Sequence, residues 1–483
     1  MSILANLEPK KVLYFFEELS KIPRGSSNEK AVSDYCKKFA EERSLEVYQD
    51  EIFNIVIKKA GTKGKENNET VILQGHLDMV CEKNKDTEFD FLKDGIKLKL
   101  EGDFLSGTGT TLGADNGVAV AIAMAILDSN DLEHPPLEAV FTAQEETGMD
   151  GAFALDTSIL KATKMINIDT DTEGIFFTSC AGGNKNQGFL NIDYVTIDKN
   201  LYHGYTLEVK GLKGGHSGVE IDQERGNANK LAFRILRKIF NECDLFIYDV
   251  DGGAKDNAIP RECQISFMIK KGDEVKAKEL VNTLSEIIKK EYAVQDAGLK
   301  IILSESDCVD KAFSKENSKN LINCIILLPN GVVTMSTNIH GLVETSNNVG
   351  VIKVVDGKVV ITSATRSSTL SKKEALKDKI KLVYDTFGFD TSFYGDYPAW
   401  EFKAESTLRP LVSEVYEGLF GNTPTLSAIH AGLECGLIIG KMPNLDIIAT
   451  GATILDAHTP DERVSISSLE KTYKLIIAVL AKL

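Results

Sequence analysis

Segment 71–79, VILQGHLDM, constrains the fold of this chain more than any other stretch. Its apolar residues predict a short buried strand that delivers His76 and Asp78 to its exit. Side chains two apart along a strand point the same way, so the imidazole and the carboxylate can face one spot. Such a pair can bind a divalent metal directly, or the carboxylate can orient an imidazole ligand. A strand-end histidine that only satisfies a loop carbonyl is the simpler alternative.

Two further predicted strands end in carboxylates. Strand 137–143 runs into Glu145 and Glu146, and strand 165–168 runs into Asp169. Adjacent carboxylates after a strand point in different directions, so one can bind metal while the other moves protons. A solvated acidic turn is the alternative for Glu145 and Glu146. Because ligands gather at the carboxyl ends of strands in α/β sheets, three such ends together favour a site.

Two loops supply additional candidates. The Gly- and Thr-rich segment 105–117 matches neither of the phosphate-binding motifs G-x-G-x-x-G and G-x-x-x-x-G-K-[ST]. It places Asp115 just before an apolar helix predicted at 118–127. Asp115 can cap that helix, or its carboxylate can bridge two metals near His76. His458 lies in a loop between a predicted strand and the last helix, and it is either a lone surface histidine or a further ligand.

Two amphipathic helices open the chain, at 10–22 and 28–43, with Ser26 or Ser27 available to cap the second helix. Segment 46–58 is then predicted to be a strand. Helix, strand, turn and strand in this order, followed by further alternation, indicate an α/β fold.

With 483 residues, the chain is too long for a single core. Residues 1–187 and 400–483 share the alternating pattern, which predicts one α/β domain with a mostly parallel sheet flanked by helices. Residues 188–399 look like two α+β modules in series that interrupt this domain. Within them, the pair Asp356-Gly357 predicts the turn of a β-hairpin over 351–366.

The charge and the cysteine content limit which classes of partner the chain can bind and in which cellular compartment we expect it. The 55 basic and 71 acidic residues give a formal net charge of −16, which disfavours nucleic acid and anionic membrane as partners. No stretch of about 18 apolar residues occurs, and the start does not resemble a secretory leader. The eight cysteines include no C-x-x-C pair, so neither a zinc ribbon nor a redox dithiol is indicated. We expect a cytoplasmic protein without a nucleic-acid or membrane partner.

Seven motifs along the chain resemble those of the M20 metallopeptidases, most closely the bacterial aminoacyl-histidine dipeptidase branch, also called Xaa-His dipeptidase or peptidase D. They span most of the chain and occur in the order of that family. The motifs are GHLDMV (75–80), LGADNG (112–117), QEETG (144–148), NIDTD (167–171), KGGHSG (213–218), HAGLECG (430–436) and AHTPDE (457–462).

The resemblance implies a catalytic α/β domain, interrupted by a lid domain, that binds two Zn²⁺ ions. Asp115 would bridge the two ions, Asp78 would orient His76, and Glu145 would act as the general base. The other implied ligands are His76, Glu146, Asp169 and His458. Co²⁺ or Mn²⁺ can occupy a site with the same donors.

The resemblance also directs attention to substrate-binding residues, in the lid and in the motif HAGLECG that follows it. His216 is the candidate donor to a developing oxyanion, and His430 would touch the substrate. Asn257 lies in the first lid module, in the segment DNAIPRE, and Arg366 ends a predicted strand of the second module. An arginine fork binds both oxygens of a carboxylate, so Arg366 is expected to bind the C-terminus of a dipeptide. An exposed lid arginine without this role is the alternative.

We therefore expect a metallo-dipeptidase that cleaves small unblocked dipeptides, preferably with a C-terminal histidine. An M20 deacylase of N-acyl amino acids would share every metal ligand, and a metal-binding relative without catalysis is a third alternative. The presence of Glu145 argues against the third, because a protein without catalysis does not need the base. Since the lid has two modules, we expect a monomer or homodimer whose active site is completed within one chain.

Overall fold

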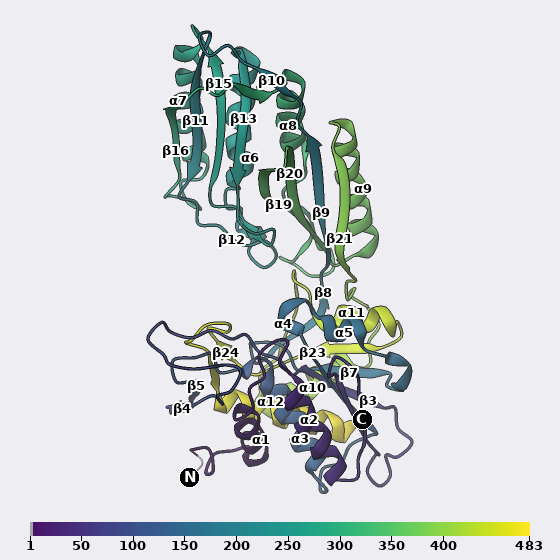
Figure 1. Ribbon diagram of the computed structural model, residues 1–483. Helices are drawn as coiled ribbons and strands as arrows, with labels where there is room; N and C mark the ends of the chain where they lie inside the picture. Colours follow the sequence, from purple (N-terminus) through teal and green to yellow (C-terminus); the bar gives the residue numbers. More distant parts are fainter. Residues whose placement is uncertain (1–2) are drawn as a thin grey trace. The chain divides into compact units, whose positions relative to one another are not determined.

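The computed structural model describes residues 3–483, which divide into two compact units (Figure 1). Unit 1 contains the chain up to Ser179 together with Phe402–Ala428 and Leu433–Leu483. Unit 2 contains Cys180–Glu401 and Ile429–Gly432. The boundaries expected from the sequence, 187/188 and 399/400, lie inside unit 2, because strand β9 (Gly182–Asn191) already pairs within the sheet of unit 2.

The sheet of unit 1 has eight strands, of which the four central ones run parallel. They are, in spatial order, β6 (Leu137–Thr142), β3 (Val71–His76), β7 (Lys164–Asn167) and β23 (Asp446–Ala449). Every residue of β3, β6 and β7 is buried, as expected for strands covered on both faces. The flanking strands β1, β2 and β8 pair antiparallel, so the sheet is mixed. The flanking strands are β1 (Glu46–Gln49), β2 (Ile55–Lys59), β8 (Ile175–Cys180) and β22 (Thr425–Ile429).

One hydrophobic core joins five helices to one face of this sheet. The strand residues in this core alternate along each strand, for example Val71 and Leu73 in β3, because successive side chains point to opposite faces. Helix α3 is apolar almost all round and nearly every residue of it is buried, so it forms the middle of the core. The five helices are α1 (Lys10–Ser20), α2 (Lys30–Glu42), α3 (Ala114–Asp128), α10 (Leu408–Phe420) and α12 (Ile466–Lys482).

A small four-stranded sheet brings two distant loops of unit 1 together. Strand β5 (Phe104–Gly107), which precedes α3, pairs with β25 (Arg463–Ser465) near the end of the chain. Strands β4 (Leu98–Glu101) and β24 (Ile454–Leu455) complete this sheet. The loop that leads into α3 and the loop between β24 and β25 are therefore held at neighbouring positions.

Two local sequence predictions are wrong. Segment 46–58 is not one strand but the hairpin of β1 and β2, because Asp50 turns the chain by accepting hydrogen bonds from the backbone of Ile52 (3.1 Å) and Asn54 (2.8 Å). Helix α2 begins after Glu29 and has no side-chain cap. The predicted caps have other partners, since the Ser26 hydroxyl donates to Asp78 (2.8 Å) and the Ser27 N–H donates to Glu29 (2.8 Å).

Unit 2 is built on one nine-stranded sheet, whose two halves and their helices share a single hydrophobic core (Figure 1). The halves meet where β13 pairs with β19, through Asp251 with Lys353 and Gly252 with Ile352. The first half contains β11 (Tyr202–Lys210), β13 (Leu245–Gly252), β15 (Cys263–Lys270), β16 (Lys300–Ser306), α6 (Ala228–Glu242) and α7 (Glu274–Glu291). The second contains β9, β18 (Gly331–Met335), β19 (Val343–Val355), β20 (Lys358–Ser367), β21 (Asp390–Tyr397), α8 (Lys315–Leu327) and α9 (Leu370–Thr386).

The hairpin predicted around Asp356-Gly357 is confirmed. Strands β19 and β20 pair up to Val355 and Lys358, so the two turn residues alone connect them. Asp356 and Gly357 both have positive φ (49° and 75°), the geometry that favours this residue pair in two-residue hairpins. Among residues 3–483, no helix combines the length and apolar composition that crossing a bilayer requires.

Candidate functional site

The carboxyl ends of three adjacent parallel strands in unit 1 carry the predicted ligands. His76 is the last residue of β3, and Asp169 follows the end of β7 by two residues. Glu145 and Glu146 follow β6 closely. Because β6, β3 and β7 are neighbours and run parallel, these side chains meet at one edge of the sheet.

Glu145 and Glu146 do not extend from a strand end as the sequence suggested. They begin the short helix α4 (Glu145–Gly148), which is preceded by Gln144 with φ of +56°. The Asp78 carboxylate accepts their backbone N–H groups, at 3.0 Å from Glu145 and 3.2 Å from Glu146. The first turn of a helix leaves such donors free, so Asp78 both starts this helix and fixes the two glutamates.

Asp78 also contacts His76. The Nδ1 atom of His76 lies 3.1 Å from the Asp78 carbonyl oxygen and 3.4 Å from Oδ1 of the Asp78 carboxylate. Burial alone would raise the pKa of Asp78, but the hydrogen bond with His76 and those from Glu145 and Ser26 lower it to about 2. An ionised Asp78 therefore holds the His76 ring with Nε2 directed away from it.

Asp115 lies between two histidines. Its Oδ1 is 3.2 Å from Nε2 of His76, and its Oδ2 is 3.2 Å from Nε2 of His458. The capping alternative for Asp115 is not what the structure has, because Gly113 is the N-cap of α3 and the Asp115 oxygens face the two histidine rings. Each oxygen of one carboxylate thus faces a different imidazole, which is the geometry of a bridging ligand.

The remaining carboxylates divide between the two histidines. Near Nε2 of His76 lie Oδ1 of Asp169 (3.6 Å) and Oε2 of Glu145 (4.0 Å). Near Nε2 of His458 lies Oε1 of Glu146 (3.1 Å). Donor atoms of His76, Asp115 and Glu146 all lie within 4.8 Å of one another, so they can surround a single cation.

Glu146 tests whether a metal fits this arrangement. Its Oε1 atom is buried and makes no hydrogen bond, although it lies close to the His458 ring. A buried carboxylate oxygen without a donor is costly unless a cation takes that place. Imidazole nitrogen and carboxylate oxygen together suit Zn²⁺ and related divalent ions, so the residues fit a metal.

The carboxylates favour the charged form of both histidines. Burial lowers the pKa of His76, but Asp169, Asp115 and Asp78 outweigh it and raise the pKa well above its ordinary value. The hydrogen bond with Asp115 is the largest effect on His458, whose pKa rises to about 10. Burial would raise the pKa of Asp115, yet its hydrogen bonds with the two histidines lower it.

The pKa values of Asp169 and Glu145 are raised, in contrast to that of Asp115. Burial raises the pKa of Asp169 well above its usual range, with Asp115 and Glu145 adding to the effect. Burial likewise raises the pKa of Glu145 to about 8. Within the described part of the chain, no lysine or arginine forms an ion pair with these carboxylates. Protons or a divalent cation must therefore supply the positive charge.

Three polar residues around the ligands were not singled out from the sequence. Ser26 donates to Asp78, as described above. Asn116 accepts the His76 N–H (3.2 Å) and donates to the Ile168 carbonyl (2.8 Å), so it ties the ends of β3 and β7 together. Asn116 belongs to the motif LGADNG, which was the available signal.

The third, Glu434, begins helix α11 (Glu434–Lys441) and is fully buried. Its Oε2 accepts from Gln74 in β3 and from Thr142 in β6, at 2.6 Å each. Burial raises the pKa of Glu434 to about 8. It comes from the motif HAGLECG, in which the sequence analysis named only His430.

In unit 2, three of the four predicted substrate residues converge. A Cβ atom placed on Gly218 would lie 2.9 Å from the His216 ring, 3.2 Å from Arg366 Nε and 2.5 Å from the His430 carbonyl oxygen. Asn257 joins through its backbone, because its carbonyl accepts from the Ser217 N–H (2.9 Å). Strands β12 (Gly215–His216) and β14 (Ala258–Ile259) pair beside it.

Arg366 gives this second cluster its charge. It is partly buried, its Nη1 donates to the Tyr397 hydroxyl (2.9 Å), and its Nε is buried without a hydrogen-bond partner. Burial, reinforced by Arg366, lowers the pKa of His216 and lowers that of His430 to about 3. His430 is held by a hydrogen bond between its Nε2 and Ser346 Oγ (2.7 Å). A guanidinium beside two neutral histidines is suited to binding an anion.

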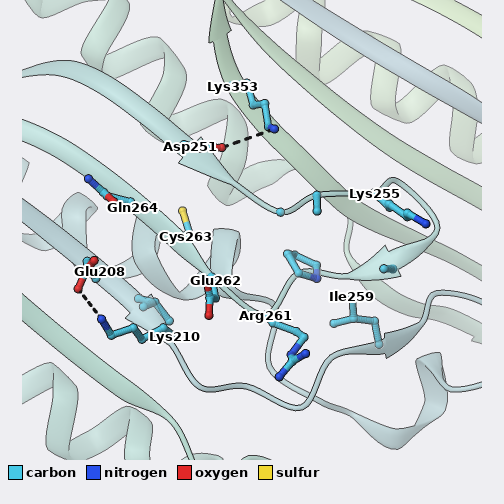
Figure 2. Close-up of a pocket in the computed structure, with 15 residues that line it drawn as sticks. Glu208, Lys210, Asp251, Lys255, Ile259, Arg261, Glu262, Cys263, Gln264 and Lys353 are labelled. Atoms are coloured by element: carbon cyan, nitrogen blue, oxygen red, sulfur yellow. Dashed lines mark hydrogen bonds and ion pairs between the residues drawn. The ribbon is translucent and has the colours of Figure 1, made fainter. Parts of the chain in front are cut away.

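A cavity of about 650 Å³ in unit 2 is lined in part by Ala258 and Ile259 of β14, the strand that pairs with β12 (Figure 2). Acidic and basic side chains alternate in its lining and pair with one another, Lys210 with Glu208 (2.9 Å) and Lys353 with Asp251 (3.9 Å). None of the predicted site residues lines it. Because acidic and basic side chains occur together in its lining, the cavity gives no indication of a ligand class.

Comparisons relate the chain to known peptidases. Residues 207–296 match the family model of the M20 peptidase dimerisation domain. The cytosol non-specific dipeptidase of Escherichia coli is 40% identical over 484 aligned residues, which cover 100% of this chain and 99% of that protein. The crystal structure of aminoacylhistidine dipeptidase from Vibrio alginolyticus matches with a TM-score of 0.93 and 36% identity, over 100% of this chain and 98% of that one. An aminopeptidase from Bacillus cereus shares the fold, with a TM-score of 0.57 and 17% identity over 99% of each chain.

Replacing Asp115 by Ala should lower the amount of metal bound per chain. The donor atoms around His76 and those around His458 would both lose the carboxylate that they share. Metal per chain is measured by plasma mass spectrometry after dialysis against Zn²⁺. Asp171→Ala, which removes an exposed carboxylate from the nearby acidic stretch, is the matched control and should bind as much metal as the parent. Parental metal content in the Asp115→Ala protein would contradict the bridging geometry.

Proposed function

The chain belongs to the M20 family of peptidases, and we propose that it is a dinuclear metallo-dipeptidase that hydrolyses unblocked dipeptides, with a preference for C-terminal histidine. The observation that carries the dinuclear proposal is Asp115, whose two carboxylate oxygens face His76 and His458 separately. The dipeptide substrate is proposed from the full-length similarity to two proteins that are named dipeptidases. The preference for histidine rests on the name of the Vibrio protein, aminoacylhistidine dipeptidase.

The proposed ligand sets follow the grouping of the side chains. His76 and Asp169 would hold one ion, His458 and Glu146 the other, and Asp115 would bridge them. Zn²⁺ is the proposed metal, with Co²⁺ or Mn²⁺ as alternatives for the same donors. When bound, such a pair supplies Lewis acidity for the scissile carbonyl and for water.

Glu145 is the proposed general base. It faces the His76 side of the cluster, and no lysine or arginine of the described chain pairs with its carboxylate, which leaves that group free to accept a proton. It would take the proton from the attacking water and deliver it to the leaving amine. Asp78 would keep both His76 and Glu145 in place, through the His76 ring and the Glu145 N–H.

The cluster of unit 2 is proposed to bind the substrate. Arg366 would pair with the C-terminal carboxylate, since its guanidinium retains an unused buried donor. His216 would donate to the developing oxyanion, and His430 and Asn257 would contact the rest of the dipeptide. We propose the cytoplasm as the compartment, which agrees with the name of the Escherichia coli relative, cytosol non-specific dipeptidase.

A substrate panel tests this function directly. Dipeptides with free amino and carboxyl ends should be hydrolysed, with higher kcat/KM for those that end in histidine. Tripeptides, dipeptide amides and N-acyl amino acids should be poor substrates. Preferential hydrolysis of N-acyl amino acids would replace the dipeptidase proposal by the deacylase alternative.

Glu145→Gln should lower kcat by about two to four orders of magnitude, because the amide cannot accept the proton. Metal content should stay at the parental value, since Glu145 is not in either proposed ligand set. Steady-state kinetics and metal analysis of the same sample measure both quantities. Glu133→Gln, at an exposed position of the same unit, serves as the control. The base assignment would be refuted by a Glu145→Gln enzyme with near-parental turnover.

One chain is proposed to contain a complete active site, because unit 2 supplies both His216, in β12, and Arg366, in β20. The test mixes the inactive variants Glu145→Gln and His216→Ala under conditions where subunits exchange. A self-contained chain should recover no activity. If His216 served the site of a partner subunit, random pairing would restore roughly a quarter of the parental activity. Such recovery would contradict the single-chain proposal.

A further inference from the structure

A buried carboxylate holds the backbone of the segment that leads to Asp115. Glu462 is 2% exposed, and each of its oxygens accepts two N–H groups. Oε2 accepts from Leu112 (2.7 Å) and Gly113 (2.9 Å), and Oε1 accepts from Ala114 (2.8 Å) and Asp115 (3.2 Å). Four consecutive backbone donors at the start of α3 therefore share one acceptor group.

Glu462 also belongs to the segment that carries His458. It lies four residues after His458 and directly before β25, whose pairing with β5 anchors this part of the chain. Through Glu462, the His458 loop is fixed to the backbone of Asp115, a partner more than 340 residues away in the sequence. A shift of either loop would separate the His458 ring from the Asp115 carboxylate.

A buried cation holds the same segment from a different part of the chain. Arg24 is 3% exposed, and its Nη1 donates to the carbonyl oxygens of Leu77 (2.8 Å) and Asp78 (3.3 Å). Its Nη2 donates to the carbonyl oxygen of Gly113. Arg24 thus connects the exit of β3, directly after His76, to the Asp115 segment.

Two glycines of the motif LGADNG provide the space for the Arg24 guanidinium. A Cβ atom on Gly113 or on Gly117 would lie 2.5 Å from Nη2 of Arg24. Gly113 also has a φ of +71°, which side-chain-bearing residues rarely adopt. The two glycines of this motif therefore make room for a buried arginine, and they do not form a phosphate-binding loop.

Charge compensation accounts for the burial of both groups. Gly113 donates its N–H to Glu462 and accepts from Arg24 with its carbonyl oxygen, so one residue's backbone binds an anion and a cation. No carboxylate among the described residues forms an ion pair with Arg24, whose partners are backbone carbonyls. Buried charges are expensive unless they are hydrogen-bonded, and this arrangement satisfies both.

We propose that Arg24 and Glu462 are positioning residues of the metal centre, which hold the segments of His76, Asp115 and His458 in the relative places that let Asp115 face both histidines. This inference rests on the dinuclear centre proposed above. Neither side chain touches the metal in this proposal; each acts through the backbone of ligand-bearing segments. Loss of either should weaken metal binding more than it weakens the fold.

Glu462→Gln is the sharpest variant, because it keeps the volume of the side chain but places an NH₂ group opposite two backbone donors. Co²⁺ is titrated into metal-free protein and followed by its visible absorption, which reports the coordination of the ion rather than turnover. We expect Co²⁺ affinity about 10- to 100-fold below that of the parent, the usual effect of residues that orient metal ligands. Arg24→Lys, which cannot span the three carbonyls, should act in the same direction.

Glu138→Gln is the matched control. Glu138 is also a 2% exposed carboxylate of unit 1 that accepts backbone N–H groups, from Lys161 and Ala162, but these belong to no ligand segment. It should lower thermal stability in the way Glu462→Gln does and leave the Co²⁺ titration unchanged. Parental Co²⁺ binding in both Glu462→Gln and Arg24→Lys would overturn the positioning role, as would equal weakening in Glu138→Gln. A parent protein that bound no Co²⁺ would instead overturn the proposed metal centre and this inference with it.

Discussion

The parallel alignment of β6, β3 and β7 is the constraint on which the rest of unit 1 depends. Parallel neighbours end at the same edge of a sheet, so three segments far apart in sequence deliver His76, Asp169 and the Glu145–Glu146 pair to one place. This alignment requires strands that are buried on both faces, which the continuous apolar runs and the apolar helix α3 provide. Asp115 and His458 then reach the same edge through the small sheet of β5 and β25.

Concentrating carboxylates in a buried site has an electrostatic cost that shapes the surroundings. An uncompensated buried charge costs several kcal/mol, more than most single contacts contribute, so positive charge has to be present. The surrounding carboxylates raise the pKa of His76 and burial raises that of Asp169, so protons can supply this charge. A divalent cation would replace those protons, and metal binding is then coupled to proton release. The same cost explains why Asp78 and Glu462 accept several backbone N–H groups each.

The sequence predicted what depends on local pattern and on recognised motifs. The strand ending in His76, the strand that leads to Asp169 and the Asp356-Gly357 turn follow from periodicity and turn chemistry, and the structure has them. What it could not predict are partners that meet only in the folded chain. Ser26 was expected to cap a helix and instead donates a hydrogen bond to Asp78. The sequence gives no sign that Glu462 accepts four backbone N–H groups. Glu145 and Glu146 enter a helix because the Asp78 carboxylate accepts their N–H groups. Asp78 and Glu145 are 67 residues apart in the sequence.

The side-chain clusters of the two units differ in the charge of the ligand that each can bind. Unit 1 gathers carboxylates around two histidines and therefore favours cations. Unit 2 places Arg366 beside two histidines whose pKa values are lowered, so its cluster keeps one positive charge and favours an anion. A substrate that is cleaved by metal-assisted hydrolysis and that ends in a free carboxylate needs both properties. The proposed dipeptide offers a partner for each property, a carbonyl for a metal held by unit 1 and a C-terminal carboxylate for Arg366 of unit 2.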